Sequence, residues 1–224
     1  MPASRAFSRR AGPPVMAPEF LFDGAEGVAT VVLAHGAGGP MDSPFMNDLA
    51  AGLAAAGLRV ARFEFPYMRA RRETGRGGAP DREPVLREAW SAAVERLGGG
   101  PALVIGGKSM GGRIASLVAD EVGARGLLCL GYPFHPPGQP DRLRTRHLAT
   151  LRTPALVLQG TRDPFGTPLD VERYVLSTSI RVNWIEDGDH SWKPRARSGR
   201  TLAQNLEEGI ARAVEFVAGL PPAR

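Results

Sequence analysis

The sequence predicts a single α/β domain built on a mainly parallel sheet with helices on both faces. The first observation is a strict alternation of short apolar runs, rich in β-branched residues, with segments whose apolar residues recur at helical spacing. The second is that loops of unusual composition directly follow four of the apolar runs, where ligand sites of such sheets lie. A chain of 224 residues with 43% apolar content suits one large core, and no second boundary interrupts residues 19–220.

Each expected element has its own signal in the chain. The expected strands, taken in order, are residues 28–34, 58–65, 102–105, 126–130, 155–159 and 180–185. The expected helices are residues 44–56, 83–97, 109–122, 168–176 and 201–218. Prolines at 44 and 84 suit a first helical turn, and the glycines at 57 and 98–100 are typical stops. Residues 66–80 are rich in glycine and arginine, which favours a loop there.

The termini and composition exclude several classes of protein. Residues 1–18 hold three arginines, four prolines and no acid, so a disordered tail is expected, and they lack the apolar core of a secretory signal. No run approaches the roughly 18 apolar residues of a membrane span, so we expect a cytoplasmic protein with no membrane partner. The single cysteine, Cys129, excludes an internal disulfide and is expected to be a buried core residue.

The basic balance does not predict a nucleic-acid-binding protein. The formal net charge is +5, and of the 28 basic residues only Lys108 and Lys193 are lysines. Most arginines are scattered among acids, and no zinc-finger, helix-turn-helix or RNA-binding motif accompanies them. We therefore expect no nucleic-acid partner, no cofactor and no metal.

The most informative stretch joins the apolar run 102–105 to a helical pattern. It contains Gly107-Lys108-Ser109-Met110-Gly111, which matches the G-x-S-x-G nucleophile elbow. A serine on such a tight strand-to-helix turn needs a strained backbone and neighbours without Cβ atoms. The rival interpretation, a phosphate-binding loop ending in Gly-Lys-Ser, requires glycine at position 102, where the chain has Ala102.

A nucleophilic serine needs a base and an acid that orients the base. Ser109, Asp163 and His190 each stand just past an expected strand. Competing residues are the histidines His35, His135 and His147 and the aspartates Asp187 and Asp189. Only His190 follows the last strand, and the two aspartates beside it are too close in sequence to reach the far ring nitrogen. Asp187 and Asp189 are interpreted as solvated or turn-forming residues.

From residue 28 onward the chain resembles the α/β-hydrolases and is similar to their small dienelactone-hydrolase-like group. The segments that carry the resemblance are His-Gly-Ala-Gly-Gly at 35–39, Gly-Lys-Ser-Met-Gly at 107–111, Gly-Thr-Arg-Asp at 160–163 and Gly-Asp-His at 188–190. Dienelactone hydrolases proper carry a cysteine as nucleophile, where this chain has Ser109. The resemblance implies the chain order serine, aspartate, histidine, which Ser109, Asp163 and His190 follow.

The resemblance also implies where an oxyanion would bind. The N–H of Met110, the residue after the nucleophile, is the first expected donor, and the N–H of Ala37 is the second, with Gly36 as the alternative. Tyr132, Phe134 and Trp192 are candidate walls of an acyl pocket, although packing in the core explains them nearly as well. Lys108 is interpreted either as a pocket residue or as an ordinary surface charge.

The expected function is hydrolysis of small, soluble carboxylic esters or thioesters through an acyl-enzyme. Only some two dozen residues separate the strands at 126–130 and 155–159, where larger lipases carry a helical lid, so an open site is expected. The alternative is a catalytically silent hydrolase fold that serves as a scaffold for protein–protein interaction. The intact set of Ser109, Asp163 and His190 favours the enzyme.

Overall fold

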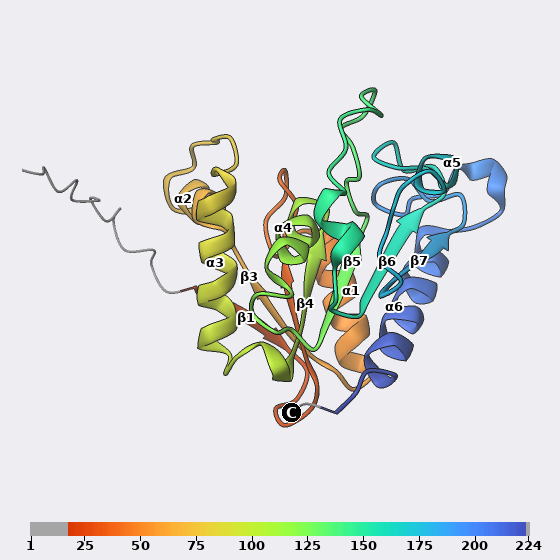
Figure 1. The fold of residues 1–224 in the computed structure, drawn as a ribbon. Coiled ribbons are helices and arrows are strands. Elements are labelled where there is room, and N and C mark those ends of the chain that lie inside the picture. Colours follow the sequence, from red (N-terminus) through yellow and green to blue (C-terminus); the bar gives the residue numbers. More distant parts are fainter. Residues whose placement is uncertain (1–17, 223–224) are drawn as a thin grey trace, which may run out of the picture.

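A computed structural model describes residues 18–222, so nearly all of the tail expected at residues 1–18 lies outside the described residues. Its centre is a seven-stranded sheet in the order β1-β3-β2-β4-β5-β6-β7 (Figure 1). β1 is antiparallel to β3, and the other neighbouring strands are parallel. The strands are β1 (Phe20–Asp23), β2 (Thr30–Ala34), β3 (Arg59–Phe63), β4 (Leu103–Lys108), β5 (Gly126–Leu130), β6 (Ala155–Gly160) and β7 (Ile180–Ile185).

Helices cover both faces of the sheet, as the alternating pattern predicts (Figure 1). The α-helices are α1 (Pro44–Ala55), α2 (Pro66–Thr74), α3 (Glu83–Arg96), α4 (Met110–Val118), α5 (Pro168–Val171) and α6 (Leu202–Ala218). Short 3-10 helices are η1 (Gly100–Ala102), η2 (Arg146–Thr150) and η3 (Ala196–Ser198). α4 and α5 end four and five residues earlier than expected (118 against 122, 171 against 176). No helix among residues 18–222 has the length and apolar character needed to cross a membrane.

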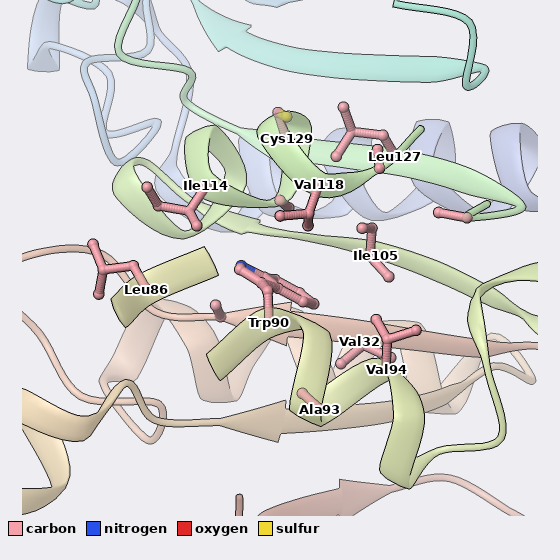
Figure 2. Packing of buried hydrophobic residues seen from close by; sticks show 14 of the residues in the cluster. Val32, Leu86, Trp90, Ala93, Val94, Ile105, Ile114, Val118, Leu127 and Cys129 are labelled. Carbon is pink, nitrogen blue, oxygen red and sulfur yellow. The ribbon is translucent and has the colours of Figure 1, made fainter. Parts of the chain in front are cut away.

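Alternate residues of each strand serve two separate cores. Val31 and Leu33 of β2 face α1 and α6, whereas Val32 and Ala34 face α3 and α4. Every residue of β4, β5 and β6 is buried, which explains their unbroken apolar sequence. Figure 2 shows Trp90 pointing from α3 toward α4 and β4, where its indole N–H donates to the Gly111 carbonyl across 3.3 Å.

The expectation of a loop at 66–80 is wrong for its first part, because Pro66–Thr74 forms α2. Glycine and arginine content favoured a loop, but two of the arginines, Arg69 and Arg72, form ion pairs. Arg69 contacts Glu73 one turn along the helix, with 3.1 Å between Nε and Oε1. Arg72 binds the carboxylates of Asp42 and Glu64, outside the helix. These partners come from other elements, so the local sequence does not reveal them.

Strand β1 was not expected from the sequence. Its four residues pair antiparallel with β3, from Phe20 opposite Phe63 to Asp23 opposite Val60. A run of four residues gives almost no periodic signal. Its Asp23 carboxylate accepts a hydrogen bond from Arg62, a buried arginine of β3, across 2.9 Å.

The four unusual loops all leave the carboxyl ends of parallel strands, at one edge of the sheet. They follow β2, β4, β6 and β7. β2 and β4 are neighbours, and the helices that follow them, α1 and α4, pack against opposite faces. The crevice between two such strands is the place where open α/β sheets bind ligands. The fold therefore brings the loop at 35–39 and Ser109 to the same crevice.

Candidate active site

Ser109 lies in a strained turn between β4 and α4. Its φ is 51° and its ψ is −114°, a backbone region that residues with a side chain rarely adopt. The flanking glycines allow this turn, because a Cβ atom on Gly107 or Gly111 would lie only 2.1 or 2.3 Å from the carbonyl oxygen of Ala34. The sequence-based interpretation of residues 107–111 as an elbow agrees with this geometry.

The side chain of Ser109 is half-buried and makes no hydrogen bond to another residue within 18–222. Its backbone N–H donates to the Leu130 carbonyl of β5 across 3.0 Å, which fixes the elbow on the sheet. Met110 begins α4, so its N–H belongs to the first helical turn and has no acceptor within the helix. The nucleophile candidate thus stands beside an unpaired N–H at the positive end of a helix.

Asp163 and His190 meet at the same edge from the loops after β6 and β7. The Nδ1 atom of His190 lies 2.7 Å from Oδ2 of Asp163. An ionised carboxylate can only accept, so the ring proton stands on Nδ1 and Nε2 remains a proton acceptor. The Asp163 side chain is fully buried, whereas the His190 side chain is 23% exposed. The orienting acid is therefore shielded from water while the ring of the base remains accessible.

Gln159, the penultimate residue of β6, holds Asp163 in place. Its side-chain N–H donates to Oδ2 of Asp163 across 2.9 Å, and its Oε1 accepts the backbone N–H of Tyr132 across 2.7 Å. The backbone N–H of Phe165 donates to the other carboxylate oxygen across 2.9 Å. The sequence signal for this role is a polar residue near the end of an otherwise apolar, fully buried strand.

The other aspartates of the histidine loop have structural contacts. Asp189 forms a turn, accepting the backbone N–H groups of Ser191 at 2.8 Å and Lys193 at 3.0 Å. Asp187 was expected to be solvated or turn-forming, but its side chain is only 5% exposed and binds Arg162 and Arg195. The hydrogen bond from Arg195 lowers the pKa of Asp187 to about 2. Neither the Asp187 nor the Asp189 carboxylate forms a hydrogen bond with the His190 ring. That ring is hydrogen-bonded to Asp163.

The oxyanion-loop candidates lie directly against the elbow. A Cβ atom on Gly36 would be 3.7 Å from the Cβ of Ser109. His35 is fully buried, and its Nε2 accepts the backbone N–H of Phe65 across 3.1 Å. Burial lowers the pKa of His35, so the ring is neutral and carries its proton on Nδ1, 2.7 Å from the Gly36 carbonyl. His35 therefore holds the loop as a structural residue rather than as a base.

The peptide group between Gly36 and Ala37 is fixed through its carbonyl. In a trans peptide the N–H points away from the carbonyl, so the bond from His35 to the Gly36 oxygen turns the Ala37 N–H to the other side. The hydroxyl of Tyr67 in α2 donates to the next carbonyl, that of Ala37, across 3.0 Å. Within residues 18–222 the Ala37 N–H has no protein acceptor.

Comparison with known proteins identifies the family and the fold of this chain. Residues 27–218 match the family model described as an alpha/beta hydrolase domain. The chain belongs to the α/β-hydrolase family. Three solved structures show the same fold at low sequence identity. They are an alpha-beta serine hydrolase homologue from Coxiella burnetii, a serine hydrolase without a lid from Xanthomonas campestris and a dienelactone hydrolase from Anabaena variabilis.

The shared fold extends over nearly the whole of each chain. The Coxiella protein has a TM-score of 0.66 and 20% identity over 87% of this chain and 91% of its own. The Xanthomonas protein has a TM-score of 0.61 and 18% identity, over 94% and 98% of the two chains. The Anabaena protein has a TM-score of 0.65 and 21% identity, over 92% and 100%.

The aromatic residues considered as pocket walls are part of the core of this α/β-hydrolase. Tyr132 and Phe134 are fully buried on the face of α3 and α4, and Trp192 is fully buried on the opposite face. The Trp192 ring packs against Phe45 and against Gly209 of α6, where a Cβ would lie 2.5 Å from the indole. The structure therefore favours core packing, the second of the two interpretations, for all three.

Trp192 anchors the histidine loop of the hydrolase to α6. Its φ is 65°, an unusual backbone conformation for a bulky residue. The side-chain amide of the fully buried Asn205 donates to the Trp192 carbonyl across 2.7 Å and to the Glu186 carbonyl across 3.2 Å. The loop that carries His190 is thus fixed at its base.

A second serine–histidine pair lies away from the elbow of this hydrolase. The Oγ atom of Ser116 in α4 lies 2.8 Å from Nε2 of His147 in η2. However, the single hydroxyl proton of Ser116 is donated to the Arg113 carbonyl across 2.6 Å, so His147 acts as the donor toward Ser116. Ser116 is buried in a helix interior, and burial lowers the pKa of His147 to about 4. This pair connects η2 to α4 and lacks the arrangement of a base activating a nucleophile.

Two further sequence expectations concern cysteine chemistry and metals. Cys129 is buried beneath the elbow, with Sγ 3.6 Å from the Gly112 carbonyl, and burial raises the pKa of its thiol. The position thus suits a core residue. Within residues 18–222, no three side chains of the types His, Cys, Asp and Glu are grouped as a metal site would require.

Proposed function

We propose that this α/β-hydrolase is a serine hydrolase that cleaves small carboxylic esters or thioesters through an acyl-enzyme. Ser109 is the nucleophile, His190 the general base and Asp163 the acid that orients the base. The observation that carries the proposal is the 2.7 Å hydrogen bond between His190 Nδ1 and Asp163 Oδ2, at the same edge of the sheet as the strained elbow of Ser109.

In the first half-reaction His190 Nε2 accepts the Ser109 proton while the oxygen attacks the ester carbonyl. The C–O bond of an ester, or the C–S bond of a thioester, then breaks, and His190 gives the proton to the departing alcohol or thiol. In the second half-reaction His190 takes a proton from a water molecule, whose oxygen attacks the acyl-enzyme. The bond to the Ser109 oxygen then breaks, His190 returns the proton to Ser109, and the carboxylic acid is released. Asp163 stays ionised and stabilises the imidazolium that forms in each half.

The N–H groups of Met110 and Ala37 supply the charge stabilisation. Both are unpaired within the described residues. Met110 follows Ser109 at a helix N-terminus, and Ala37 follows Gly36, where a Cβ would lie 3.7 Å from the Cβ of Ser109. A fixed donor of this kind contributes about 3 kcal/mol to stabilisation of the transition state. The carbonyl anchors at Gly36 and Ala37 support this role, because they keep the loop from turning its oxygens toward the substrate.

The short segment between β5 and β6 supports a small, soluble substrate. Residues 131–154 contain only the 3-10 helix η2 and no helical cover over the carboxyl edge of the sheet. The Xanthomonas neighbour is likewise described as a serine hydrolase without a lid. An uncovered site suits short acyl chains that dissolve in water.

A fluorophosphonate probe tests the proposal without knowledge of the natural substrate. Such a probe phosphonylates a serine and releases fluoride only where a base removes the serine proton and donors receive the phosphoryl oxygen. We expect stoichiometric labelling at Ser109, mapped by peptide mass spectrometry, and its loss in Ser109→Ala and His190→Ala.

Ser116→Ala is the matched control, because Ser116 is a serine whose hydroxyl contacts a histidine, His147, outside the elbow. It should keep full labelling. A folded wild-type protein without label at Ser109 would instead favour the scaffold, and labelling of Ser116 would transfer the nucleophile to the second pair. Labelling that survives in His190→Ala would require another base.

A further inference from the structure

Lys108 contacts the histidine loop from inside the elbow motif. It is the last residue of β4, directly before Ser109, and its side chain is buried with 8% of the residue exposed. Its Nζ atom donates to the backbone carbonyl oxygen of His190 across 2.5 Å. The residue before the candidate nucleophile is therefore bonded to the candidate base.

The surroundings of Lys108 keep its ammonium group at this position. The methylene stem lies beside Gly36 of the oxyanion loop, and Nζ lies 5.6 Å from the centre of the Phe45 ring. Gly131 leaves the space in which the contact forms, since a Cβ there would lie 3.0 Å from both Nζ and the His190 oxygen. The φ of Gly131, +68°, also favours glycine.

The charges around Lys108 favour a protonated amine at neutral pH. The negative charges of Asp163 and Asp189 attract the ammonium group, and the His190 carbonyl accepts a hydrogen bond from it. Burial acts in the opposite direction and lowers the pKa of Lys108 to about 8. Burying a cation is costly, and an apolar side chain of the same length would fill this space without that cost. The position thus suggests a use for the charge other than stability.

The geometry indicates what that use is. Asp163 bonds the His190 ring at Nδ1, and the Phe165 ring packs with its centroid 4.3 Å from that of the His190 ring, but neither contact fixes the backbone of His190. Trp192 and Asn205 fix the far end of the loop, two residues later. The bond from Lys108 fixes the backbone of His190 itself and connects it to the strand that carries Ser109.

We propose that Lys108 is a positioning residue that fixes the backbone of His190 relative to the strand that carries Ser109, so that the His190 ring can take the Ser109 proton when substrate binds. The inference rests on the proposed function, because it assigns a role within the same site. It makes Lys108 neither a pocket residue nor a surface charge. A shift of about 1 Å in such a base costs on the order of 100-fold in rate.

The test uses Lys108→Met, which keeps the length of the side chain and removes its charge and donor. Lys193→Met is the matched control, because Lys193 is the only other lysine, lies in the same loop and has an exposed side chain. Three quantities are measured for each: the rate of fluorophosphonate labelling at Ser109, amide hydrogen exchange of the peptide covering residues 186–195, and the melting temperature.

We expect Lys108→Met to label about 10- to 100-fold more slowly than wild type. Exchange of the loop amides should be about tenfold faster, while the melting temperature is unchanged or higher. With an activated ester substrate, kcat should fall and KM should stay within about twofold. Lys193→Met should match wild type in all of these measurements.

The outcomes separate this inference from the proposed function. Wild-type labelling and loop exchange in Lys108→Met would overturn the positioning role while Ser109 remains the nucleophile. A wild-type protein that does not label would contradict the proposed function, and the exchange data alone would then decide whether Lys108 holds the loop. A large loss of melting temperature, or failure to fold, in both Lys108→Met and Lys108→Gln would show a general structural role and overturn the inference.

Discussion

The hydroxyl of Tyr67 in α2 donates a 3.0 Å hydrogen bond to the carbonyl oxygen of Ala37 in the loop after β2. Burial raises the pKa of this phenol above its ordinary value of 10, so the group remains a donor at physiological pH. Arg62 and Glu64 bind the carbonyl and N–H of Met41, further along the same loop, at 2.9 and 3.3 Å. The oxyanion-loop candidate is therefore fixed from α2 and from the end of β3.

Tyr67→Phe should lower kcat about tenfold and leave KM nearly unchanged, because loss of one hydrogen bond of about 1 kcal/mol loosens a donor that acts mainly in the transition state. Steady-state kinetics with p-nitrophenyl acetate measures both constants. Tyr174→Phe is the control, since the Tyr174 hydroxyl makes no hydrogen bond to another residue within 18–222. Equal kcat values for the two variants would show that the Tyr67 bond does not position the loop.

Asp163→Asn should lower the rate of catalysis, whereas Asp187→Asn should lower stability. Asparagine at 163 favours the wrong histidine tautomer, so kcat should fall about 10⁴-fold with little change in melting temperature. Asparagine at 187 weakens the contacts with Arg162 and Arg195, so the melting temperature should fall while kcat stays within about threefold. Near-normal activity of Asp163→Asn, together with an inactive but folded Asp187→Asn, would reverse the assignment of the acid.

Lys108→Met should be more stable than wild type at neutral pH. The pKa of Lys108 is lowered from 10.5 to about 8 by burial, so the folded state disfavours the charged amine by roughly 3 kcal/mol below pH 8. Between pH 8 and 10.5 the unfolded chain holds more protons than the folded one, so wild-type stability from this group rises with pH. The free energy of unfolding in urea, measured for both proteins at pH 7 and pH 10, should show an advantage of the variant that shrinks at the higher pH. An advantage that grows with pH would contradict the buried, protonated amine.

Hydrolysis of short-chain aryl esters should follow ordinary saturation, with no jump in rate at the solubility limit of the substrate. The reason is the absence of a helical cover between β5 and β6, so no lid has to open at a lipid surface. Rates measured across an acyl-chain series from two to sixteen carbons, below and above the solubility limit, test this. A marked preference for emulsified long chains would contradict the open site.

Local sequence was sufficient for the elbow and for most of the sheet. Gly107 and Gly111 reveal the turn because no other residue fits against the Ala34 carbonyl, and the apolar runs of β4, β5 and β6 reveal buried strands. The four loops could be placed at one edge because parallel strands all point the same way. The candidate triad followed from that placement and from the resemblance, without any distance.

Contacts between distant segments decided what the sequence left open. The helix α2 depends on partners such as Asp42 and Glu64, which a composition-based expectation does not include. The burial of Tyr132 and Trp192 depends on the face of the sheet toward which each loop turns. Tyr132 packs in the core formed with α4, and Trp192 packs in the core formed with α6, and the loop sequences alone do not reveal these contacts. The sequence left Lys108 open between a pocket residue and a surface charge, because the His190 carbonyl that accepts its hydrogen bond lies 82 residues away. Periodicity and turn chemistry act over a few neighbouring residues, whereas burial, ion pairing and a cation's access to water are properties of the packed molecule.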